Sequence, residues 1–172
     1  IRLGLKPEEL ISVIGDYDAL VVRSQTQVSA EVIAAGEKLQ VIARAGAGVD
    51  NIDVEAATRR GIVVVNAPTG NTISAAEHTI ALMLALARHI PQANATLKSG
   101  QWRRSDFMGI EVKDKTLGII GLGNVGSEVA RRARGLQMKL IAYDPFISVD
   151  HAQKLQVELV SLDQLLREAD FI

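Results

Sequence analysis

The sequence predicts an α/β protein made of two doubly wound, parallel-sheet units of the Rossmann or flavodoxin type, joined by a long helix. Short β-branched runs alternate with helical patterns along the chain, which favours right-handed crossovers and helices on both faces of a parallel sheet. One long helical pattern, residues 74–98, separates two such series, and a glycine-rich turn lies inside the second. We therefore expect one unit at residues 1–69 and another at residues 70–172.

The first unit is expected to hold three helices and three strands in alternation. Pro7 suits a first helical turn, Ser29 is a helix cap, and Gly36 and Gly61 follow helical runs as stop signals. The helices are predicted at residues 7–14, 29–35 and 53–60, and the strands at 19–23, 41–43 and 62–65.

The second unit begins with the long helix, which a capping box at Ser74–Glu77 opens and which Pro91 should kink. Its apolar residues cover more than one side, so we expect burial between domains or subunits. After a polar connection, strands are predicted at 116–121 and 139–144, and helices at 124–135, 151–157 and 161–168. Residues 170–172 are typical of the start of another buried strand, and the chain is therefore expected to be a segment of a longer protein.

Composition limits the class of protein. The chain has 172 residues, 48% of them hydrophobic, and a formal net charge of −1. The near-neutral charge gives no electrostatic reason to expect nucleic acid or an anionic membrane as a partner. No apolar run has the length of a membrane span or signal peptide, and the absence of cysteine excludes disulfides and thiolate metal sites. We expect a cytoplasmic protein.

The turn after the strand at 116–121 has the spacing of a dinucleotide-binding fingerprint. Gly121 permits the tight turn, Gly123 lets the backbone approach a pyrophosphate, and Gly126 lets the next helix pack closely on the sheet. The N-terminal amides of that helix face the anion. Asp144 ends the following strand, where a carboxylate binds ribose hydroxyls and repels a 2′-phosphate, so NAD is favoured over NADP. A merely structural glycine turn is the alternative, and the complete strand, turn, helix and acid order favours nucleotide binding.

Two further candidates lie where predicted strands end, which is where ligands of open α/β sheets bind. In residues 44–50, Gly46 and Gly48 leave backbone amides accessible to a carboxylate or phosphate. A tight turn whose glycines only avoid strain is an equally good interpretation. Arg23 could recognise such an anion with its planar guanidinium, or pair with an acidic neighbour, and both interpretations stay open.

No acid–base or nucleophilic group can be assigned from these residues. His78, His89 and His151 have no orienting carboxylate at an interpretable spacing and no H-x-x-x-H zinc pattern, so helix-surface roles are favoured. Arg103 and Arg104 are expected to be a solvated pair unless a neighbouring subunit brings an anionic site to them.

Several blocks, spread almost from end to end, together resemble the NAD-dependent D-2-hydroxyacid dehydrogenase family. They are residues 20–26 (LVVRSQT), 44–53 (RAGAGVDNID), 66–71 (NAPTGN), 74–78 (SAAEH) and the fingerprint. Residues 100–104 (GQWRR) and 106–109 (DFMG) resemble the branch that acts on a phosphorylated hydroxy acid. The resemblance implies oxidation of 3-phosphoglycerate to 3-phosphohydroxypyruvate with NAD, the entry to serine biosynthesis.

The resemblance also implies roles for individual residues. The implied cofactor contacts are Ala47, Gly121, Gly123, Asn124, Val125, Gly126 and Asp144. The implied substrate contacts are Arg23, Arg44, Gly48, Val49, Asn71 and Arg104. Ala47 stands where the family often has a threonine, so a hydroxyl contact is missing there. Arg104 would reach the phosphate of a neighbouring subunit's substrate, and the helix at 74–98 would form part of a dimer interface in a homodimer or homotetramer.

By the same resemblance, residues 1–69 are part of a substrate-binding domain and residues 70–172 part of an NAD-binding domain. The family's catalytic arginine, glutamate and histidine lie downstream of the third strand of the nucleotide domain. None can be assigned here, and a polypeptide ending at Ile172 is expected to be inactive. Two alternatives are a dehydrogenase of another D-2-hydroxy acid, such as lactate, glycerate or formate, and a non-catalytic, NAD-responsive protein of the corepressor type.

Overall fold

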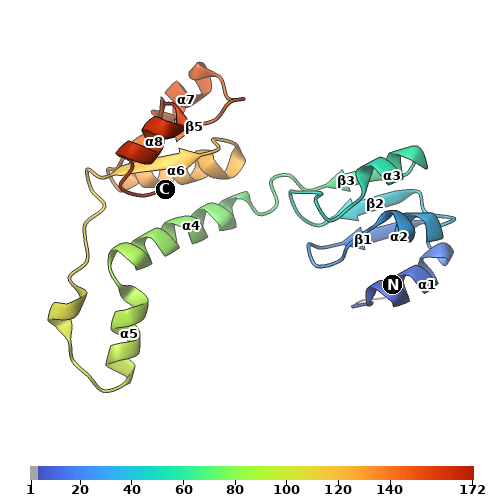
Figure 1. Cartoon of the computed structure of the whole chain (residues 1–172), viewed down its shortest axis with the longest axis horizontal. Helices are drawn as coiled ribbons and strands as arrows, with labels where there is room; N and C mark the ends of the chain where they lie inside the picture. Colours follow the sequence, from blue (N-terminus) through green and yellow to red (C-terminus); the bar gives the residue numbers. More distant parts are fainter. Residues whose placement is uncertain (1–3) are drawn as a thin grey trace. The chain divides into compact units, whose positions relative to one another are not determined.

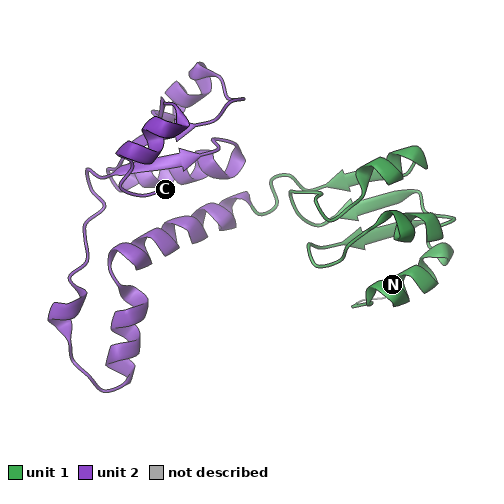
Figure 2. Ribbon diagram, viewed as in Figure 1, with its two compact units in different colours: residues 1–71 green, residues 72–172 purple. Residues whose placement is uncertain are grey.

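A computed structural model describes residues 4–172 and divides the chain into two compact units, residues 1–71 and 72–172 (Figure 2). The predicted boundary lay between residues 69 and 70. Each unit alternates helices with parallel strands (Figure 1), so the predicted α/β class is confirmed.

The first unit has one three-stranded parallel sheet in the order β1-β2-β3. Its elements are α1 (Pro7–Val13), η1 (Ile14–Asp16, a 3-10 turn), β1 (Ala19–Val22), α2 (Ala30–Ala35), β2 (Val41–Arg44), α3 (Val54–Arg59) and β3 (Val63–Asn66). The predicted cap at Ser29 is present, because its Oγ accepts from the Val32 N–H at 3.5 Å. Asp53, which was predicted as the first residue of a helix, is the N-cap of α3, and its Oδ1 accepts from the Ala56 N–H at 2.8 Å.

Only one face of this sheet is covered in the part of the chain that the structure describes. Leu20, Ile42 and Val64 lie in register on the covered face, with Ile42 completely buried. On the opposite face, the side chains of Val21 and Val63 are 71% and 57% exposed. The expectation of helices on both faces of the sheet is therefore not met in the described part of this unit.

The second unit has a parallel sheet in the order β4-β5-β6. Its elements are α4 (Thr72–Ala87), α5 (Ile90–Lys98), η2 (Arg104–Phe107, a 3-10 turn), β4 (Thr116–Ile120), α6 (Asn124–Gly135), β5 (Lys139–Tyr143), α7 (Val149–Leu155), β6 (Glu158–Leu159) and α8 (Leu162–Glu168). The sequence did not predict β6 or η2. Phe171 forms an isolated parallel bridge with Leu117, on the edge of β4, in agreement with a strand start there.

Here helices cover both faces of the sheet, as predicted. Leu117 and Ile119 of β4 belong to the core that contains Val129 and Ala130 of α6. Gly118 points to the other face, where an added Cβ would lie 2.7 Å from Leu165 of α8. The second unit is thus doubly wound.

The predicted long helix is two helices. Chain direction changes at His89, which has a left-handed φ of 52°, and Pro91 lies in the first turn of α5 instead of kinking a continuous helix. Proline is well placed there because the first-turn amides have no helical acceptor. The helix α4 begins at Thr72, so Ser74 lies inside its first turn and is not the N-cap.

Residues 88–110 form an arm between α4 and the segment that enters β4. Its base is closed by the Ile110 N–H, which donates to Ala87 O at the end of α4 at 2.8 Å. Gly109 makes this approach with a φ of 63°. The arm exposes large apolar side chains, with Trp102 and Met108 each 79% exposed.

Candidate functional site

The glycine turn between β4 and α6 is closed by backbone packing. Gly121 has a φ of 90°, which favours glycine, and its N–H donates to Tyr143 O of β5 at 2.9 Å. A Cβ on Gly126 would lie 2.1 Å from Gly121 O. Gly121 and Gly126 therefore allow the start of α6 to lie against the turn, as the fingerprint requires.

Gly123 differs from these two glycines, because the space that a side chain would occupy is open. It is the N-cap of α6, and an added Cβ would have no heavy atom within 4 Å. No side chain caps this helix end, and within residues 4–172 the Gly123 N–H has no acceptor. Asn124 and Val125 are the first residues of the helix. A 12-residue helix thus presents uncapped amides beside an open backbone surface, which suits a phosphate anion.

Asp144 lies beside this turn, at the end of β5. One carboxylate oxygen accepts from the Phe146 N–H and the other from the Leu122 N–H, each at 2.8 Å. The hydrogen bond from Phe146, followed by that from Leu122, lowers the pKa of Asp144 below its usual range. The carboxylate is therefore ionised at neutral pH. A carboxylate has about four lone-pair sites, so Asp144 keeps accepting capacity for a sugar hydroxyl, and the turn, the helix end and Asp144 fit a dinucleotide with an unphosphorylated ribose.

An apolar cavity of about 530 Å³ adjoins the turn inside the second unit. Gly121, Val125 and Gly126 line it together with Ile120 and Met83. The glycine turn therefore borders a space large enough for part of an organic ligand.

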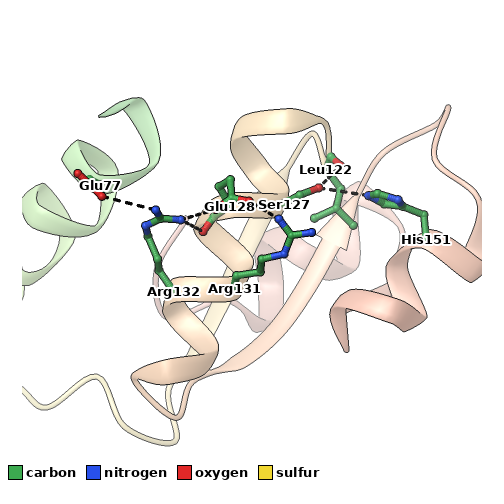
Figure 3. Close-up of polar contacts among 7 residues, drawn as sticks. All are labelled: Glu77, Leu122, Ser127, Glu128, Arg131, Arg132 and His151. Atoms are coloured by element: carbon green, nitrogen blue, oxygen red, sulfur yellow. Dashed lines mark hydrogen bonds and ion pairs between the residues drawn. The ribbon is translucent and has the colours of Figure 1, made fainter. Parts of the chain in front are cut away.

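The sequence did not predict a polar chain behind the turn. The Ser127 hydroxyl donates to Leu122 O at 3.0 Å, and His151 Nε2 of α7 lies 3.2 Å from the same hydroxyl (Figure 3). Ser127 is buried, with 6% of its surface exposed. The two side chains are 24 residues apart, so no local spacing pattern could have indicated their contact. His151 was expected to be an ordinary surface histidine.

In the first unit, the loop after β2 surrounds the Arg44 side chain, which is only 10% exposed. Its Nη1 pairs with Asp50 Oδ1 at 2.9 Å, and its Nε is buried without a hydrogen-bond partner. A Cβ on Gly48 would lie 2.8 Å from Arg44 Nη1, so this glycine permits the guanidinium to lie along the loop. The Arg44 Nε–H is therefore a donor without an acceptor among residues 4–172.

Backbone contacts hold the loop in place. Asn66 Nδ2 at the end of β3 donates to Ala47 O at 2.5 Å, and the buried Asn51 donates to Arg23 O at 3.0 Å. Arg23 follows β1 and Arg44 ends β2, so both lie at the carboxyl edge of the same parallel sheet. Val49 is partly buried within the loop, whereas the Arg23 side chain is exposed.

The other predicted substrate contacts lie elsewhere. Asn71 is exposed at the end of the first unit. Arg104 is in η2 of the second unit, where it lines a pocket of about 250 Å³ with Trp102 and Phe107. Arg103 and Arg104, which were expected to be solvated, are both exposed. Arg103, the N-cap residue of η2, also forms an ion pair with Asp106 at 4.0 Å.

Residues 4–172 contain neither a candidate metal site nor a helix that could span a membrane. No group of histidine and acidic side chains is arranged to hold a metal ion. None of the helices is both long and apolar enough to cross a membrane.

The family model for the catalytic domain of D-isomer-specific 2-hydroxyacid dehydrogenases matches residues 1–165, and the chain belongs to this family. A D-3-phosphoglycerate dehydrogenase of Archaeoglobus fulgidus is 59% identical over 172 residues, which are 100% of this chain and 33% of that protein. The chain thus spans about a third of the length of the curated relatives it matches.

Solved structures have the same fold. A crystal structure of a Thermus thermophilus protein has a TM-score of 0.89 at 32% identity, covering 98% of this chain and 54% of that one. The D-lactate dehydrogenase of Aquifex aeolicus, solved with NAD and lactic acid, has a TM-score of 0.84 at 28% identity, covering 93% of this chain and 48% of that one.

Proposed function

We propose that the full-length protein is an NAD-dependent dehydrogenase that oxidises 3-phosphoglycerate to 3-phosphohydroxypyruvate, in the entry to serine biosynthesis. The observation that carries this proposal is the ionised Asp144 beside an uncapped helix end. High identity to D-3-phosphoglycerate dehydrogenases along the whole chain supports the choice of substrate. NAD, when bound, accepts the hydride from the hydroxyl-bearing carbon.

The second unit supplies the cofactor contacts in this proposal. Amides of Gly123, Asn124 and Val125 bind the pyrophosphate, because they lack acceptors among residues 4–172 and stand at the positive end of α6. Asp144 accepts hydrogen bonds from the adenosine ribose. Gly121 and Gly126 keep the turn tight, and the backbone of Ala47 adds a contact from the first unit without a hydroxyl.

The first unit supplies the contacts to the substrate carboxylate. Gly48 and Val49 offer backbone amides, and Arg44 offers its Nε donor, which has no hydrogen-bond partner in the described part of the chain. Arg23 adds a second, exposed cation at the same sheet edge. Burying a cationic donor without a partner is costly, and an anionic substrate would supply that partner.

Asn71 and Arg104 complete the proposed substrate site. Asn71 contacts the substrate, and Arg104 binds the phosphate of a substrate held by a neighbouring copy. The protein is then a homodimer or homotetramer, located in the cytoplasm, without nucleic acid or membrane as partners. Its exposed arm in the second unit supplies the surface for a second copy.

The test of the cofactor site is the substitution Asp144→Ser in the full-length protein. We expect kcat/KM for NAD to fall about tenfold or more, because charge-assisted hydrogen bonds are lost, and discrimination against NADP to weaken. Asp163→Ser, which removes an exposed carboxylate from the first turn of α8, is the control. Unchanged cofactor preference in Asp144→Ser would contradict the assignment.

A substrate panel at saturating NAD tests the reaction. Turnover of 3-phosphoglycerate that falls strongly in Arg104→Ala supports the proposal, because lactate, glycerate and formate have no second anionic group for this arginine to bind. Turnover of one of those acids in place of 3-phosphoglycerate, or NAD-dependent assembly without turnover, would overturn it.

A further inference from the structure

We propose that Ser127 and His151 are positioning residues for the cofactor, because together they fix the peptide group between Leu122 and Gly123. This inference rests on the proposed NAD site and assigns to it two residues outside the glycine fingerprint. Both residues lie behind the turn, on α6 and α7, and need not touch the cofactor.

Ser127 fixes the direction of the peptide group between Leu122 and Gly123. Ser127 donates to Leu122 O, which therefore points back toward α6. The peptide bond is trans, so the Gly123 N–H points in the opposite direction from that carbonyl. This N–H has no acceptor within residues 4–172, and the Gly123 surface is open. The serine thus directs the Gly123 N–H to the side where the pyrophosphate would lie.

His151 determines where the hydroxyl proton of Ser127 points. A hydroxyl has one proton, and Ser127 can donate it either to Leu122 O or to His151 Nε2. When Nε2 carries a hydrogen, it donates to Ser127 at 3.2 Å, and the serine proton is directed to Leu122 O. His151 thereby selects the hydroxyl orientation that holds the turn. Figure 3 shows His151 reaching Ser127 from a separate helix.

Leu122 is also held at its own N–H and at its side chain. Its N–H donates to Asp144, and its side chain is completely buried. Leu122 is therefore held through both peptide groups and its side chain. Without the serine contact, the Leu122 carbonyl loses the one side-chain donor that it has among the described residues, while the contact with Asp144 and the buried leucine side chain keep the residue in place. The expected loss is in the preorganisation of one amide, not in the fold.

The test measures NADH affinity of the full-length protein by fluorescence titration. We expect Ser127→Ala and His151→Leu to weaken NADH binding about threefold to tenfold, the usual range for one lost hydrogen bond. His151→Gln keeps an N–H donor near the Nε2 position and should restore affinity to within about twofold of the wild type. Gln153→Leu, an exposed site on the same helix, is the control.

Kinetics separate positioning from general damage. KM for NAD should rise in Ser127→Ala and His151→Leu, with kcat nearly unchanged and with thermal midpoints close to that of Gln153→Leu. Wild-type affinity in both variants, or equal losses in His151→Gln and His151→Leu, would overturn the inference while leaving the proposed function standing. Absence of NADH binding by the wild type would instead contradict the proposed function itself.

Discussion

Asp144, the proposed ribose contact, also links the stability of the protein to pH. Its pKa is lowered by the hydrogen bonds from the Phe146 and Leu122 N–H groups, so the folded protein holds the ionised form more strongly than the unfolded chain does. The resulting stability is fully present above the ordinary aspartate pKa. It is lost as the pH falls through the lowered pKa of the folded state.

We therefore predict that Asp144→Asn lowers the stability of the protein at neutral pH, and that this loss shrinks in acid. The measurement is the urea midpoint of both proteins between pH 7 and the most acidic pH at which both stay folded. Asp163→Asn controls for the loss of one exposed carboxylate. A difference between Asp144→Asn and the wild type that stays constant over this range would contradict the prediction.

Two glycines of the same turn should respond differently to the same methyl group. In Gly126→Ala the new Cβ meets Gly121 O at 2.1 Å, so the turn or α6 must shift, at a cost of about 3 kcal/mol. In Gly123→Ala the Cβ enters open space, and the φ of −71° suits alanine. We predict a lower thermal midpoint for Gly126→Ala only. Gly123→Ala should keep its midpoint but bind NADH more weakly, because the methyl group occupies the ligand's side. Equal midpoints would contradict this assignment of the two glycines.

At the scale of elements, periodicity and caps predicted the strands β1 to β5 and most of the helices, whereas α4 and α5 were predicted as one helix. The helix after the fingerprint has the predicted bounds, residues 124–135, and Ser29 caps α2 as expected. The two-residue strand β6 was not predicted, because its pairing with β5 is a tertiary contact and two residues carry no period. The break at His89 was not predicted either, since a left-handed residue of this type has no distinct sequence signal.

The candidate site was predictable only where residues are close in sequence. Gly121, Gly123 and Gly126 act through backbone geometry at fixed spacing, which the sequence displays directly. The contact of Ser127 with His151, and that of Arg44 with Asp50, depend on how loops fold over neighbouring strands. Such contacts follow from tertiary packing and have no pattern of their own.

The closure of the arm gives a prediction about Gly109. Its φ of 63° is strained for alanine by about 1 kcal/mol, and a Cβ would lie 2.4 Å from Ala87 O. Gly109→Ala should therefore lower the free energy of unfolding by about 3 kcal/mol, through strain and overlap together. Gly100→Ala is the matched control, with a φ of 79° and no atom within 4 Å of the Cβ, so it reports the strain alone. Denaturant titration compares them, and equal losses would show that Ala87 does not limit the turn.

For the whole molecule, the two units differ in how completely they cover their sheets. The second unit has helices on both faces, whereas the first exposes Val21 and Val63 on one face. The curated relatives that the chain matches are about three times its length. Apolar surface of this kind is unusual on an isolated domain.

The arm gives the last prediction, which concerns association. Leu97, Trp102 and Met108 are 58%, 79% and 79% exposed, and all three lie in the arm of the second unit. Aromatic and methionine side chains are enriched at interfaces, and burying a tryptophan contributes more apolar area than burying any other residue. Trp102→Asp in the full-length protein should therefore lower the sedimentation coefficient toward that of a single copy. Gln153→Asp adds the same charge at an exposed position on α7, away from the arm, and should leave the coefficient unchanged. If Trp102→Asp sediments as the wild type does, the arm is not the surface through which two copies associate.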